Sequence, residues 1–331
     1  FGLGALLTAW DFGYLSTGTM IDRMTKMLDT MDRLERYRGH FYNWYDTRAL
    51  KPLPPRYVSS VDSGNLVAGL LLVRNGLLEL TRCPAVPPQV WDGLRDMLGV
   101  LREEAAQRQG GADLAKQIQE AQMLLVAPPA TPPERQARLR ALLKVAMRLA
   151  GRPDEECPPG ISAWCETFRR LCQDQAEFSE PFSAALPPDL SLRQAAQLAP
   201  ATAEARAAAA RAAALVQALE RLAERCHQLA MEMDFRFLYN HQRELIHIGF
   251  DVDARRLDPS CYDLLASEAR VTSFLMIAGE QAPPTHWFAL GRLLTGRGGR
   301  AALASWSGSM FEYLMPTLIM PTYSGTLMER T

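Results

Sequence analysis

Apolar residues recur every three or four positions through most of the 331-residue chain, and short stretches rich in proline and glycine interrupt this pattern. The recurrence is typical of amphipathic helices, which proline and glycine tend to end. The helical pattern breaks over 235–251, and residues 245–250 alternate with a period of two, which predicts a strand that turns at 251–256 to form a short β-hairpin. The chain is therefore expected to be mainly α-helical, with predicted helices over 1–10, 17–34, 66–80, 90–107, 112–125, 133–150, 161–177 and 201–233.

The stretch DPSCYDLLASEARVTSFLMIA, residues 258–278, also has helical periodicity. Asp258-Pro259-Ser260 offers capping oxygens and a proline suited to a first turn, so we predict that one helix starts here and carries Glu268 and Arg270. A carboxylate among apolar neighbours must be paired, solvated in a cleft or functional, because burying a lone charge is expensive. Glu268 is thus either an ion-pair partner of Arg270 or another arginine, or a site residue.

Residues 40–48, HFYNWYDTR, interleave four aromatic rings with polar side chains. Aromatic faces suit the CH groups of a sugar ring, and the polar groups between them suit its hydroxyls. The alternative is a core strand and turn whose polar tips are hydrogen-bonded. Two later segments have a similar mixture. The first is YVSSVDSGN (57–65), in which Asp62 is either the N-cap of the helix predicted over 66–80 or a ligand-facing residue. The second is SWSGSMFEYLMP (305–316), which predicts a short helix after Ser307-Gly308-Ser309.

Composition excludes several classes of function. The 36 basic and 37 acidic residues are balanced, which argues against a nucleic-acid partner. The six cysteines and five histidines lack metal-site spacing, so we expect no metal and reduced thiols, and no nucleotide cradle or G-x-S-x-G motif is present. The longest uncharged apolar run, 66–73, is far short of the ~20 residues that span a bilayer, so no transmembrane segment is predicted. The chain starts without Met and inside a predicted helix, so we expect a piece of a longer protein.

The motifs at 39–65, 258–278 and 305–316 resemble the cyclisation domain of bacterial cyclic β-1,2-glucan synthases, also called a glycoamylase-like domain. The resemblance implies an (α/α)6 barrel of helical hairpins, here incomplete, with a short β-hairpin and an accessory helical region. We divide the chain into N-terminal barrel hairpins with the aromatic segment (1–83), an Ala/Arg-rich helical part (84–233) and a motif region (234–331).

The resemblance also implies an activity. Glycoside transfer uses two carboxyl groups flanking the bond, and Glu268 in LLASEAR matches one catalytic glutamate of the family, to which we assign the nucleophile role. The family's second glutamate is expected beyond residue 331, so this chain alone is expected to be incomplete and inactive. The implied reaction is retaining transfer within a linear β-1,2-glucan, without cofactor.

The partners expected from the resemblance are the glucan and the glycosyltransferase and phosphorylase-like domains of the same synthase, at the cytoplasmic face of the bacterial inner membrane. The alternatives are an endo-β-1,2-glucanase and a non-catalytic helical module for glucan binding or assembly. The expected substrate-binding residues are Trp44, Tyr45, Asp46, Arg48, Tyr57, Asp62, Tyr262, Arg270, Trp306, Glu312 and Tyr313.

Overall fold

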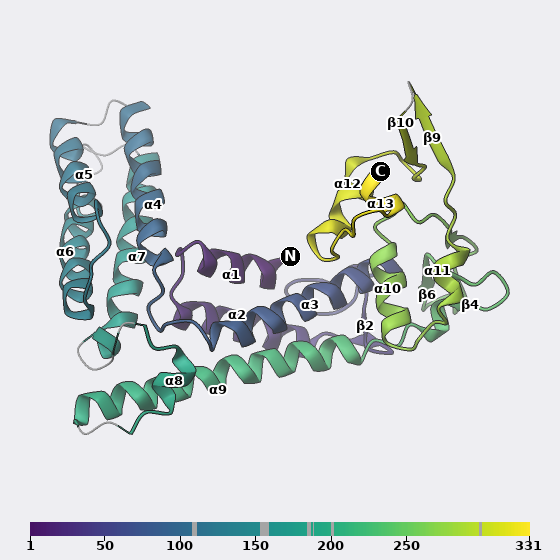
Figure 1. Ribbon diagram of the computed structural model, residues 1–331, viewed down its shortest axis with the longest axis horizontal. Helices are drawn as coiled ribbons and strands as arrows, with labels where there is room; N and C mark the ends of the chain where they lie inside the picture. Colours follow the sequence, from purple (N-terminus) through teal and green to yellow (C-terminus); the bar gives the residue numbers. More distant parts are fainter. Residues whose placement is uncertain (108–110, 153–158, 184–186, 188, 200–201, 298–299) are drawn as a thin grey trace. The chain divides into compact units, whose positions relative to one another are not determined.

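The computed structural model in Figure 1 describes all residues except 108–110, 153–158, 184–186, 188, 200–201 and 298–299. Because 60% of the chain is helical and the strands form only small hairpins, the predicted mainly α-helical class is confirmed. The α-helices are α1 (Gly2–Asp11), α2 (Thr17–Arg33), α3 (Ser60–Leu80), α4 (Gln89–Gln107), α5 (Ala112–Leu124), α6 (Pro132–Ala150), α7 (Pro159–Ser183), α8 (Leu192–Ala196), α9 (Ala203–Met231), α10 (Arg270–Ala278), α11 (Thr285–Ala289), α12 (Met310–Leu314) and α13 (Leu327–Arg330).

The strands are short and all pair antiparallel. They are β1 (Arg36–Tyr37), β2 (His40–Phe41), β3 (Tyr57–Ser59), β4 (Tyr239–Asn240), β5 (Leu245–His247), β6 (Gly249–Asp251), β7 (Arg256–Leu257), β8 (Cys261–Tyr262), β9 (Leu294–Arg297) and β10 (Arg300–Leu303), and the 3-10 helices are η1 (Arg236–Leu238) and η2 (Met315–Leu318).

Contacts group the chain into two compact units. Unit 1 comprises Phe1–Met27 and Asn75–Ala223, and unit 2 comprises Leu28–Arg74 and Glu224–Thr331. In the described residues, neither unit closes its helices into a barrel. The three-part division by sequence stays a prediction about segments of the chain.

Unit 1 is built around α4, α5, α6 and α7, which lie side by side (Figure 1). Their facing stripes supply a fully buried core that includes Leu98, Leu114, Leu142 and Phe168. The helices predicted over 90–107, 112–125 and 133–150 are confirmed to within one residue. These segments are rich in strong helix formers, and proline or glycine lies between one segment and the next. The helix predicted over 161–177 continues to Ser183, since the apolar rings of its last turns are buried.

Unit 2 contains short strands, of which β3 leads directly into α3, and the hydroxyl of Ser60 donates to the carbonyl oxygen of His247 in β5 at 2.8 Å. β3, β6 and β7 form one sheet, and β4, β5 and β8 form another. The strand predicted over 245–250 is confirmed as β5 and β6, and the predicted hairpin that turns at 251–256 is formed by β6 and β7. His247, expected to be a hydrogen-bonded strand residue, contacts the carbonyl oxygen of Asp258 through Nδ1 at 2.7 Å. The hairpin of β9 and β10 was not predicted, because its sequence reads only as a glycine- and arginine-rich loop, and residues 298–299 of that cluster lie outside the described residues.

Helices α3 and α10 approach each other closely at Gly64. A Cβ atom added at Gly64 would lie 1.9 Å from Oγ1 and 2.8 Å from Cα of Thr272, so only glycine fits here. The hydroxyl of Thr272 donates to the carbonyl oxygen of Ser60 at 3.3 Å. This contact brings the first turns of α3 against the start of α10.

Two predicted helix starts are wrong. The stretch 258–269 is not helical, and α10 starts at Arg270. Asp258 instead accepts a hydrogen bond from the backbone N–H of Ser260, and Cys261 pairs with His247 in the sheet, so sheet pairing outweighs local helical propensity. Helix α3 starts at Ser60 rather than Leu66, and the backbone N–H of Asp62 donates to Ser59 Oγ at 3.2 Å. Asp62 therefore lies in the first turn, and Ser59 is the cap.

Cys172 and Cys226 are buried in helices. Burial raises the pKa of both thiols, and Cys157 lies outside the described residues. Among the helices described, none combines the length and apolar character needed to cross a bilayer.

Candidate active site in unit 2

Glu268 lies in the turn that precedes α10, so it is not helix-borne as predicted. Its carboxylate Oε2 accepts a hydrogen bond from Nδ2 of Asn65, one turn along α3 from the helix start, at 3.3 Å. The Oδ1 atom of Asn65 is buried and has no hydrogen-bond partner. The close packing at Gly64 thus places an amide directly beside this carboxyl group.

The surroundings of Glu268 favour its protonated form. Burial is the largest effect and raises the pKa of Glu268; the Asn65 hydrogen bond lowers it, and the negative charges of Asp62 and Glu312 raise it further. The net result is a pKa above the ordinary value. A half-buried carboxyl group with a raised pKa is suited to carrying a proton.

The ion pair considered for Glu268 is not found. Within the described part of the chain Glu268 makes no salt bridge, and Arg270 donates from Nη2 to the carbonyl oxygen of Tyr313 at 3.1 Å. Arg270 is 4% exposed, and burial lowers its pKa. Arg270 and Tyr313 thus contact each other and tie the start of α10 to α12.

Two tyrosines lie in the same acidic surroundings. Burial, followed by the charges of Glu268 and Asp62, raises the pKa of Tyr262 to about 12. Tyr57 donates to Oδ2 of Asp258 at 3.4 Å, and burial together with that carboxylate raises its pKa to about 12. Both phenols therefore stay neutral over the physiological range. A concentration of carboxylates and neutral hydroxyls disfavours anionic ligands and suits a neutral ligand rich in hydroxyls.

Glu312 has surroundings of the opposite kind. It forms a capping box with Ser309 at the start of α12. Its oxygens accept hydrogen bonds from the hydroxyls of Ser305 and Ser307 at 3.0 and 2.5 Å and from the backbone N–H of Trp306 at 3.1 Å. Burial raises the pKa of Glu312, but the hydrogen bonds from Ser307 and Ser305 outweigh burial and lower it to about 2. The short predicted helix is confirmed, and Glu312 orders the loop that exposes Trp306.

The aromatic segment forms one wall of a hollow beside the start of α3. Trp44 is 66% exposed, and it shares the hollow with Asp62. His40 is fully buried, and its ring contacts Ser63 Oγ at 2.9 Å, which attaches β2 to the first turn of α3. The lining residues are Phe41, Tyr42, Asn43, Trp44, Asp62, Ser63 and Leu66.

The structure therefore brings together four of the predicted site residues, Glu268, Asp62, Tyr57 and Tyr262, and Asp62 lines the same hollow as Trp44. Glu312 is near enough for its charge to act on Glu268. Asp46 accepts hydrogen bonds from the backbone N–H groups of Arg48 and Ala49, so it shapes a turn, and these groups lower its pKa.

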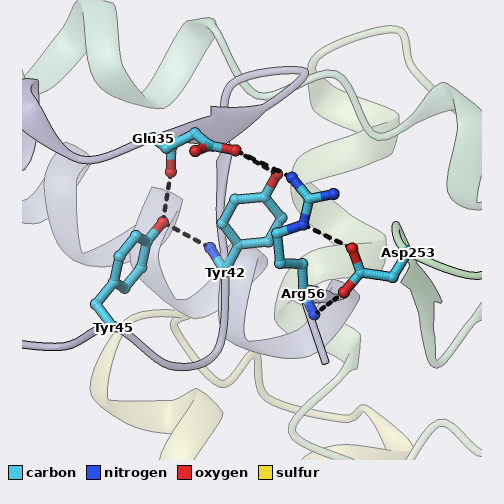
Figure 2. Close-up of polar contacts among 5 residues, drawn as sticks. All are labelled: Glu35, Tyr42, Tyr45, Arg56 and Asp253. Atoms are coloured by element: carbon cyan, nitrogen blue, oxygen red, sulfur yellow. Dashed lines mark hydrogen bonds and ion pairs between the residues drawn. The ribbon is translucent and has the colours of Figure 1, made fainter. Parts of the chain in front are cut away.

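Asn65 was not predicted as a site residue. Its position one helical turn after Asp62 could have indicated that the two side chains lie on the same face of α3. It also missed the network that holds the aromatic segment (Figure 2). In the described residues, no group of His, Cys, Asp or Glu is arranged to hold a metal ion.

No family model matches the chain. Among curated proteins, the cyclic β-(1,2)-glucan synthase NdvB of Rhizobium meliloti (strain 1021) is 34% identical over 336 residues. The chain is similar to part of a cyclic β-1,2-glucan synthase. The match takes in 99% of this chain and 11% of the length of NdvB. The resemblance drawn from the motifs is thus confirmed for the synthase, and the assignment to its cyclisation domain stays a prediction.

Proposed function

We propose that unit 2 takes part in retaining transglycosylation of β-1,2-glucan, closing a linear chain into a ring. The observation that carries this proposal is the state of Glu268: a half-buried carboxyl group with a raised pKa, hydrogen-bonded to Asn65 and without an arginine partner among the residues that the structure describes. It lies close to tyrosine hydroxyls and near the hollow lined by Trp44. Similarity to the synthase NdvB supports a β-1,2-glucan as the substrate class.

These surroundings favour a proton-transfer role for Glu268 over the nucleophile role that the resemblance led us to expect. A general acid benefits from a pKa above the ordinary carboxyl value, and burial and the charges of Asp62 and Glu312 raise the pKa of Glu268. In the first step, Glu268 gives its proton to the glycosidic oxygen while a second carboxylate bonds to C1 and the bond between C1 and that oxygen breaks. We assign the role of that second carboxylate to the other glutamate that the resemblance implies.

In the second step, the ionised Glu268 takes the proton of the incoming hydroxyl as its oxygen bonds to C1 and releases the carboxylate. For ring closure, that hydroxyl is the 2-OH at the far end of the same glucan. Transfer rather than hydrolysis requires that water be kept from the covalent intermediate. We assign this role to the glucan itself, held against the exposed rings of Trp44 and Trp306.

The proposal is tested in a chain extended at its C-terminus, with linear β-1,2-glucan as substrate. The Glu268→Gln variant should lose ring formation by at least about a hundredfold, because a proton donor contributes roughly 10²–10⁴ in rate. The matched control is Glu280→Gln, which changes an exposed glutamate just after α10. Undiminished ring formation in Glu268→Gln would reject the proposal.

The products separate the alternatives. Rings without new reducing ends indicate the transglycosylase. New reducing ends without rings indicate an endo-glucanase, and glucan binding without turnover in the extended chain indicates a binding module.

A further inference from the structure

Residues 43–53 form a stiff finger that carries the exposed Trp44. Two hydrogen bonds join its two sides. The backbone N–H of Leu53 donates to the carbonyl oxygen of Trp44 at 2.9 Å, and the backbone N–H of Asp46 donates to the carbonyl oxygen of Lys51 at 2.8 Å. The carboxylate of Asp46 closes the tip, since its Oδ1 accepts from the backbone N–H groups of residues 48 and 49. The finger is thus ordered internally, and its orientation depends on what holds its base.

Five residues hold that base (Figure 2). Tyr45 donates to the carbonyl oxygen of Glu35 at 2.7 Å and accepts from the backbone N–H of Tyr42 at 2.9 Å. Tyr42 and Arg56 both approach Oε1 of Glu35, at 3.4 and 3.3 Å. Glu35, just after α2, therefore contacts both ends of the finger.

Arg56 links this carboxylate to a second element. Its Nε and its backbone N–H donate to the two oxygens of Asp253, at 2.7 and 2.9 Å, in the turn between β6 and β7 (Figure 2). The Arg56 side chain therefore bridges two carboxylates that come from different elements. Both pairs are solvated, with 40% of Arg56, 55% of Glu35 and 41% of Asp253 exposed. Ion pairs of this kind add little to folding stability, because water competes for the charges.

We propose that Arg56 is a positioning residue, which fixes the finger so that Trp44 forms a preformed part of the wall of the glucan-binding hollow that Asp62 also lines. The proposal rests on the proposed function and deepens it. Arg56 does not line the hollow, so it acts through Trp44 and not by touching the glucan. Loss of Arg56 should therefore weaken glucan binding while leaving the chemistry at Glu268 intact. Without Arg56 the finger has to be oriented when the glucan binds, and the entropy lost in that step reduces the binding free energy.

The test compares KM and kcat for linear β-1,2-glucan in the extended chain, and glucan affinity by calorimetry in the same protein. Arg56→Gln should raise KM and Kd about tenfold, with kcat within about twofold, and Arg56→Lys should restore part of the affinity by keeping the charge. The control is Arg225→Gln in unit 2, since Arg225 also spans two carboxylates, those of Asp29 and Asp32, at 2.8 and 2.7 Å. The control should leave both constants unchanged.

A double-mutant cycle supplies the decisive readout. If Arg56 acts through Trp44, Arg56→Gln should add less than about twofold to the effect of Trp44→Ala on Kd. Additive effects, an unchanged KM, or a loss in kcat equal to the loss in affinity would overturn the proposal. If the parent protein itself neither binds nor converts the glucan, the proposed function fails instead, so the two failures are distinguishable.

Discussion

Two glutamates in unit 2 lie in segments of similar composition and have opposite properties. Glu268 accepts one hydrogen bond from a side chain, and its pKa is raised; Glu312 accepts several from its own loop, and its pKa is lowered to about 2. The difference comes from the number of donors rather than from burial alone, because burial raises the pKa of both groups. A carboxylate saturated by donors orders a loop, whereas one with few donors remains available to a ligand.

The largest expected effect on stability comes from separating the elements that place Asn65 beside Glu268. Gly64→Ala should lower the free energy of unfolding by about 3 kcal/mol, because the new methyl group overlaps Thr272 backbone and side-chain atoms. Thermal unfolding measures the change. Gly69→Ala on the same helix is the control, since a Cβ there meets nothing within 4 Å, and it should stabilise by about 0.5–1 kcal/mol. Equal effects of the two substitutions would contradict the close packing at Gly64.

The comparison of the two glutamates predicts opposite effects of removing their charge. Glu312→Gln should lower the free energy of unfolding by about 1 kcal/mol at neutral pH, because the capping box loses its carboxylate. Glu268→Gln should leave stability unchanged or raise it, because glutamine cannot ionise and so avoids the cost of a half-buried charge. A stability loss in Glu268→Gln as large as that in Glu312→Gln would break the distinction.

Acid should act on stability through Glu312. A depressed pKa in the folded state contributes stability above the ordinary value of 4.5, and this contribution is lost as pH falls from 4.5 towards about 2. Thermal unfolding midpoints of the parent should fall more steeply over that window than those of Glu312→Gln. Parallel pH profiles would show that Glu312 is not the group responsible.

The smallest expected effect is a shift in the pH dependence of turnover. If Glu268 must be protonated, activity falls as pH rises through its pKa. Asp62→Asn removes a charge that raises that pKa, so the alkaline limb of kcat/KM should move to lower pH. Asp22→Asn, at an exposed position on α2, should leave the limb in place. A shift to higher pH in Asp62→Asn would contradict the assigned direction.

The sequence predicted the helical class and the helices of unit 1 because packing there follows local periodicity and propensity. It failed at 258–269, where pairing of Cys261 with His247 overrides an equally periodic pattern. It identified Glu268, Asp62, Tyr57 and Tyr262 as candidates by their residue types and the resemblance. It could not identify Arg56 as an anchor of the finger, because its acidic partners lie 21 and 197 residues away.

The role of Glu268 is tested most directly by chemical rescue in the extended chain. Glu268→Ala is given a β-configured β-1,2-gluco-oligosaccharyl fluoride, whose leaving group needs no proton, together with azide. If Glu268 is the acid/base, the covalent intermediate still forms, and azide attacks it to give the β-glycosyl azide with retained configuration. The α-glycosyl azide, formed by direct displacement of fluoride, would show that Glu268 is the nucleophile and would contradict the account.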